Sequence, residues 1–168
     1  MAGSDRFVAR VAPVFRSSLP FETERVGACA IYCSDGRYNE QFDEFLHAHL
    51  GLPRYDRLVV PGGPAVLAGH LVAHRDEAAI VDQVSFLVRA HALERAVLIA
   101  HCSCGFYRSR LSVADHRVRA AEERDLIVGA KRLRAIAPSL AIQGYVAVVA
   151  DSRVAFEEVS LDGCPSAW

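Results

Sequence analysis

Three short apolar runs, separated by longer stretches with helical spacing, organise the first two thirds of the chain. They occupy residues 26–32, 57–60 and 96–100 and are almost free of polar side chains. Runs of this length and composition are typical of strands that are buried on both faces of a sheet. Because each connection is long enough to contain a crossover helix, the pattern predicts parallel strands with right-handed crossovers.

Helical periodicity appears in three segments. The apolar faces of the first two consist of Phe42, Phe45, Leu46 and His49, and of Ile80, Val84, Leu87 and Val88. The third segment, residues 111–136, predicts one long or broken helix that ends before Pro138. Its arginines alternate with acidic residues, so we expect a salt-bridged, solvated face. The acids of that face are Asp115, Glu122, Glu123 and Asp125.

Two further strands are predicted at residues 141–150 and 154–159, joined by a tight turn at Asp151 and Ser152. The complete pattern predicts an α/β fold: a mostly parallel sheet flanked by helices, with an antiparallel C-terminal edge strand. We interpret residues 1–168 as a single domain in which residues 1–25 form an N-terminal arm.

Charge and composition restrict the choice of partner. The chain has 19 basic and 20 acidic residues and a formal charge of -1, which does not favour nucleic acid or an anionic membrane. We expect no membrane span and no secretory signal, and therefore a cytoplasmic protein that acts on a small molecule. Its five cysteines, an odd number, predict reduced thiols. They are Cys29, Cys33, Cys102, Cys104 and Cys164.

The unusual residues follow the predicted strands directly. Residues 33–37 follow the first strand, 61–64 the second and 101–105 the third. The carboxyl ends of parallel strands share one edge of a sheet, which is where ligands bind in open α/β folds. Cys33, His101 and Cys104 offer two thiolates and an imidazole, the donors that zinc prefers. A fourth position would remain for water or for a carboxylate.

Two motifs in these loops resemble those of the β-carbonic anhydrases. They are Cys-x-Asp-x-Arg at residues 33–37 and His-x-x-Cys-Gly at residues 101–105, and the residues that follow look most like the short, compact branch of that family. The resemblance implies that Cys33, His101 and Cys104 hold a zinc ion. It further implies that Asp35 and Arg37 form a dyad that controls the fourth position.

The activity that the resemblance implies is reversible hydration of carbon dioxide to bicarbonate, a carbonate dehydratase-type lyase reaction. Zinc would lower the pKa of its bound water to about 7 and generate the attacking hydroxide. Asp35, held by Arg37, would accept a hydrogen bond from that water. Family members are typically dimers or larger assemblies, so the resemblance also implies a homodimer.

Two alternatives stay open. Many family members carry an Arg-Asn-Ala-Gly type loop where this chain has residues 61–64, Pro-Gly-Gly-Pro, so the first alternative is an inactive relative or one that processes carbonyl sulfide or carbon disulfide. Residues 101–109 also match the loop of cysteine-dependent phosphatases, with Cys102 as nucleophile and Arg108 as phosphate clamp. Asp76 and Asp82 lie in a helical pattern, which does not suit the general acid of such enzymes.

Overall fold

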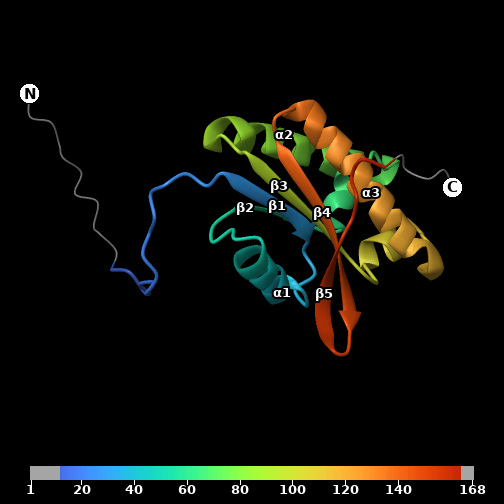
Figure 1. Ribbon diagram of the computed structural model, residues 1–168, viewed down its shortest axis with the longest axis horizontal. Coiled ribbons are helices and arrows are strands. Elements are labelled where there is room, and N and C mark those ends of the chain that lie inside the picture. Colours follow the sequence, from blue (N-terminus) through green and yellow to red (C-terminus); the bar gives the residue numbers. More distant parts are fainter. Residues whose placement is uncertain (1–11, 164–168) are drawn as a thin grey trace, which may run out of the picture.

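The computed structural model describes residues 12–163, so Cys164 and the first eleven residues of the predicted arm lie outside the described part (Figure 1). The strands are β1 (Ala28–Cys33), β2 (Asp56–Val60), β3 (Arg95–His101), β4 (Ala141–Ala150) and β5 (Arg153–Glu158). They form one five-stranded sheet in the order β2-β1-β3-β4-β5. All neighbouring pairs are parallel except β4 and β5, which confirms the predicted fold class.

Helices cover both faces of the sheet (Figure 1). The α-helices are α1 (Asn39–Glu44), α2 (His74–His91) and α3 (Asp115–Ile136). Shorter π- and 3₁₀-helical segments are η1 (Phe45–His49), η2 (Gly63–Leu67), η3 (Leu71–Ala73) and η4 (Phe106–Arg110). The predicted helix at the first connection is thus an α-helical turn that continues as a π-helical one.

The side chains of β1 point alternately to the two faces of the sheet, and a separate hydrophobic core lies on each face. Cys29 and Ile31 belong to the core that also contains residues of α2, η2 and α3. Ala30 and Tyr32 belong to the opposite core, which contains residues of α1 and η1. All of β1 is buried, as expected for a strand with helices on both faces. Cys29 is buried because it packs in the core that contains residues of α2, η2 and α3.

The β4–β5 hairpin extends beyond the rest of the sheet (Figure 1). Asp151 and Ser152 have φ values of 48° and 60°. Left-handed backbone at both central residues is the signature of the type I′ turns that suit two-residue hairpins, which confirms the predicted turn. In the described part of the chain, no helix combines the length and the apolar composition needed to cross a bilayer.

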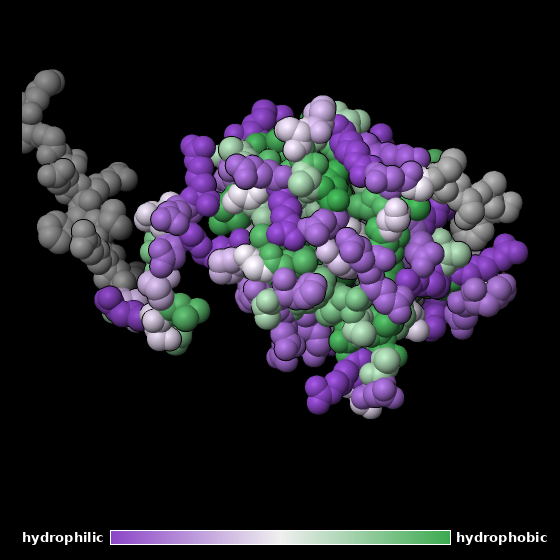
Figure 2. Space-filling view, viewed as in Figure 1, coloured by the Kyte–Doolittle hydropathy of each residue, from purple (hydrophilic) through white to green (hydrophobic). Residues whose placement is uncertain are grey.

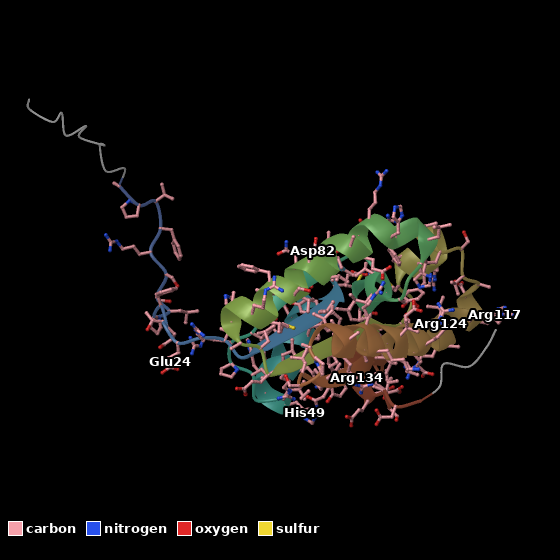
Figure 3. The ribbon with its side chains drawn as sticks, turned by 90° about the horizontal axis from the view of Figure 1, so that it is seen from above. Glu24, His49, Asp82, Arg117, Arg124 and Arg134 are labelled. Atoms are coloured by element: carbon pink, nitrogen blue, oxygen red, sulfur yellow. The ribbon has the colours of Figure 1, made fainter. Side chains whose placement is uncertain are left out.

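Two expectations for residues 111–136 need correction. The helix begins at Asp115 and not at residue 111, because Ser112 has a left-handed φ of 54°. Its charged residues also do not all face solvent. Arg117, Arg124 and Arg134 are distributed along α3 in Figure 3, but Glu122 and Asp125 are completely buried. The alternating charges therefore do not define one solvated face.

Candidate metal centre

Three side chains meet at the carboxyl edge of the parallel strands. Cys33 is the last residue of β1, His101 is the last residue of β3, and Cys104 lies three residues further along the chain. Each can offer one ligand atom, and these atoms all lie within 4.8 Å of one another. The three residues are 6%, 1% and 2% exposed. The pairing of β1 with β3 thus builds a compact, buried group of two thiols and one imidazole.

The two thiols are held by each other and by backbone amides. The sulfur atoms of Cys33 and Cys104 lie 3.9 Å apart, and the Gly62 N–H donates to Cys33 Sγ at 3.4 Å. The hydrogen bond from Cys104 lowers the pKa of the Cys33 thiol, and the same contact raises the pKa of the Cys104 thiol. The N–H groups of Phe106 and Tyr107 oppose this rise. The pocket therefore favours a thiolate at Cys33.

One ring nitrogen of His101 is engaged and the other is free. Nδ1 lies 3.0 Å from the Cys102 carbonyl oxygen, which can only accept, so Nδ1 carries the proton. Nε2 is buried and has no hydrogen-bond partner among the described residues. A buried imidazole nitrogen with a lone pair, beside two thiols, fits the donor set of a zinc site.

Asp35 and Arg37 form a closed pair beside this group. Arg37 Nε and Nη2 donate to the two carboxylate oxygens at 2.9 and 2.5 Å, and the Arg37 backbone N–H donates to Oδ1 at 3.2 Å. These bonds lower the pKa of Asp35 to about 2, so its carboxylate is ionised throughout the physiological range. Asp35 does not belong to the group of three residues whose potential ligand atoms lie within 4.8 Å of one another.

Comparison with known proteins relates this arrangement to one fold. No protein-family model matches the sequence, and no curated protein sequence matches it. Solved structures do match. The β-carbonic anhydrase isoform I from the protozoan Trichomonas vaginalis has a TM-score of 0.54 at 11% identity, covering 84% of this chain and 87% of that one. A carbonic anhydrase from Streptococcus mutans has a TM-score of 0.51 at 17% identity, covering 87% and 88%.

A carbonic anhydrase from Glaciozyma antarctica gives a similar result, with a TM-score of 0.52 at 17% identity over 83% of this chain and 85% of that one. The chain has the β-carbonic anhydrase fold. At sequence identities this low, the similarity to these structures shows only that the backbone is arranged in the same way. The chemistry of this chain must be argued from its own side chains.

The glycine loop after β2 packs closely against β1 and η4. Gly62 and Gly63 have φ values of 84° and 51°. A Cβ atom on Gly63 would lie 2.7 Å from the backbone nitrogen of Cys33, and one on Gly62 would lie 2.5 Å from the Phe106 ring. The backbone therefore lies too close to β1 at Gly63, and to Phe106 at Gly62, to carry a side chain, and the Gly62 N–H reaches the Cys33 sulfur.

The phosphatase interpretation finds less support within the β-carbonic anhydrase fold. Arg108, which would clamp the phosphate, forms an ion pair with Asp115 at 2.8 Å. The Cys102 thiol lies 3.6 Å from the Tyr38 hydroxyl, and its backbone N–H donates to the Ala147 carbonyl. Asp76 and Asp82 lie in α2, as the sequence predicts. The geometry thus favours the metal interpretation of residues 101–105.

Three features of the site were not found from the sequence. The Gly62 N–H supports the Cys33 thiol, and Tyr38 contacts both His101 and Cys102. Glu122 is a completely buried carboxyl group whose nearby charges include Cys33. The double glycine was a signal for close backbone approach. Neither the tyrosine, which precedes α1, nor the glutamate within α3 carries a sequence signal that distinguishes it from its neighbours.

Proposed function

We propose that the protein is a zinc-dependent carbonic anhydrase that catalyses the reversible hydration of carbon dioxide to bicarbonate. Cys33, His101 and Cys104 hold the zinc. The observation that carries the proposal is the buried group of two thiols and an imidazole nitrogen that has no hydrogen-bond partner within residues 12–163, at the carboxyl edge of this fold. Thiolates and a neutral imidazole suit zinc better than they suit magnesium or calcium, which prefer oxygen. Three protein ligands also leave a fourth position open, as catalytic zinc sites do.

Each residue of the site has a defined task in this reaction. When bound, zinc would act as a Lewis acid and lower the pKa of a water molecule to about 7. The Cys104 thiol and, to a smaller extent, the Gly62 N–H favour the thiolate form of Cys33, and the Cys102 carbonyl keeps the His101 proton on Nδ1. Asp35 is ionised and accepts a hydrogen bond from the attacking water. Arg37 occupies both carboxylate oxygens and thereby holds Asp35 back from the metal.

The first experiment measures the metal content of protein purified without added zinc, by elemental analysis. We expect about one zinc per chain in the wild type and in Cys102→Ser, and a large loss in Cys33→Ser and Cys104→Ser. Cys102 is the matched control because it lies in the same loop but outside the ligand group. A folded wild type without metal, or loss of metal only in Cys102→Ser, would contradict the proposal.

Turnover is tested next, by stopped-flow hydration of carbon dioxide with a pH indicator. We expect activity in the wild type and in Cys102→Ser, and none in Cys33→Ser. Zinc binding without turnover would contradict the assigned reaction and would direct the assay to carbonyl sulfide and carbon disulfide. Hydrolysis of p-nitrophenyl phosphate that is lost in Cys102→Ser would support the phosphatase interpretation instead.

We also infer that the protein is a cytoplasmic homodimer. The described part of the arm exposes Val14, Phe15, Leu19 and Phe21, which are at least 78% exposed, and it runs away from the rest of the chain (Figures 1 and 2). Burial of these side chains in a second copy would remove apolar area from water. Reduced thiols at the metal centre suit a reducing compartment. Light scattering should give twice the mass of the chain, and a monomeric mass at micromolar concentration would contradict the dimer.

A further inference from the structure

Tyr38 lies between the two halves of the candidate site. It follows Arg37 directly, its backbone N–H donates to the Asp35 carbonyl at 3.1 Å, and its own carbonyl accepts from the Phe42 N–H at the start of α1. The residue is only 6% exposed. The same turn that presents Asp35 and Arg37 therefore fixes the position of the tyrosine ring.

The ring of Tyr38 contacts the metal-ligand side chain. Its centroid lies 4.4 Å from that of the His101 imidazole, with 37° between the planes. On other sides, the ring stacks with Phe42 at 5.7 Å and lies 6.0 Å from the Arg37 guanidinium carbon. A single ring therefore lies against the imidazole, the guanidinium and the aromatic core, and aromatic contacts of this kind restrict ring rotation.

The hydroxyl of Tyr38 shares an acceptor with His101. It donates to the Cys102 carbonyl oxygen at 3.3 Å, and the same oxygen accepts the proton of His101 Nδ1 at 3.0 Å. A carbonyl oxygen has two lone pairs, so it can accept both hydrogen bonds at once. The tyrosine hydroxyl thus holds in place the oxygen that fixes the imidazole tautomer.

We propose that Tyr38 is a positioning residue that orients the His101 imidazole, with Nε2 free, for the metal. The inference rests on the proposed zinc site and deepens it. Removal of a group that orients a metal ligand typically lowers metal affinity 10–100-fold. The tyrosine ring also lies between the His101 imidazole and the Arg37 guanidinium, so it separates the ligand group from the exposed arginine.

The test compares Tyr38→Phe, which removes only the hydroxyl, with Tyr145→Phe. Tyr145 is a similarly buried tyrosine on β4 whose hydroxyl accepts from Gln143 and not from the loop of the site. Zinc affinity is measured by competition with a chromophoric chelator, and the ligand field by the visible spectrum of the cobalt-substituted protein. We expect about tenfold weaker zinc binding and an altered cobalt spectrum for Tyr38→Phe. Tyr145→Phe should match the wild type in both measurements.

The outcomes separate the inference from the proposed function. Failure of the wild type to bind zinc would contradict the proposed function itself. A wild type that binds zinc, together with a Tyr38→Phe variant of equal affinity and unchanged cobalt spectrum, would overturn the role of Tyr38. If Tyr38→Phe did not fold, nuclear Overhauser contacts between the Tyr38 and His101 rings in the metal-free wild type decide the matter: persistent contacts are expected, and their absence would refute the proposal.

Discussion

Glu122 provides a quantitative test of the protein interior near the candidate metal centre. It is 0% exposed, and neither carboxylate oxygen has a hydrogen-bond partner among residues 12–163. Burial raises the pKa of Glu122 to about 8, and the negative charges of Glu123, Asp125 and Cys33 act in the same direction, whereas Arg119 opposes them. The carboxyl group is therefore protonated in the folded protein at neutral pH.

The sign of the effect on stability follows from proton binding. The unperturbed pKa of a glutamate is 4.5, so between about pH 5 and pH 8 the folded state holds a proton that the unfolded state has released. Folding then becomes less favourable as the pH rises, by up to about 1.4 kcal/mol per pH unit. Integrated from pH 5 to pH 8, Glu122 lowers the free energy of unfolding by about 3 kcal/mol.

The perturbation is Glu122→Gln, which has the shape of the protonated acid and does not titrate. Urea unfolding of the variant and the wild type is followed by circular dichroism from pH 5 to pH 8, in the same buffer and zinc concentration, so that other proton and metal linkages cancel in the difference. The variant should gain about 3 kcal/mol relative to the wild type across this range.

The control is Glu123→Gln, the next residue of α3. Its side chain is 42% exposed and pairs with Arg119, so its replacement should change stability by under about 1 kcal/mol at each pH. Parallel pH profiles for the wild type and Glu122→Gln would refute the reasoning, because they would mean that Glu122 carries the same charge in the folded and unfolded states.

Three other predictions concern the site. Gly63→Ala should destabilise the protein by at least about 2 kcal/mol in urea unfolding, because the added Cβ meets the backbone of β1 at a left-handed φ, whereas Gly36→Ala, with open space around its Cβ, should not. Arg37→Ala should raise the pKa of Asp35 from about 2 toward 3.9, measured by carboxyl ¹³C NMR; an unchanged value would show that the guanidinium does not set it. Bound zinc should protect the two ligand thiols from alkylation, counted by intact mass; equal labelling with and without a chelator would argue against thiolate ligands.

The fold followed from the sequence because its central strands, β1 and β3, are buried on both faces, although the edge strand β2 is only partly buried. Continuous apolar runs mark such strands without any information from distant residues, and the lengths of the connections determine that they are parallel. The gathering of Cys33, His101 and Cys104 followed in turn, since parallel strands place their carboxyl ends at one edge. Local pattern and strand direction were sufficient for both conclusions.

The remaining features depend on contacts between distant parts of the chain. Tyr38 and Cys102 are 64 positions apart, and nothing near Tyr38 in the sequence indicates that its hydroxyl contacts the carbonyl oxygen of Cys102. Glu122 and Asp125 were placed on a solvated face because their neighbours are charged, yet both are buried. Charge alternation shows that a helix has a polar surface, but it does not show which of its acids face the interior.

The two parts of the candidate site differ in how firmly they are held. Cys33, His101 and Cys104 are buried, and each has a backbone or ring contact that restricts it. In the dyad, Asp35 and Arg37 have side chains that are 20% and 75% exposed, so water and salt screen their attraction. In the proposed zinc site we therefore expect a change at the fourth position to involve movement of the dyad and not of the three ligands, since exposed ion pairs separate more easily than buried side chains shift.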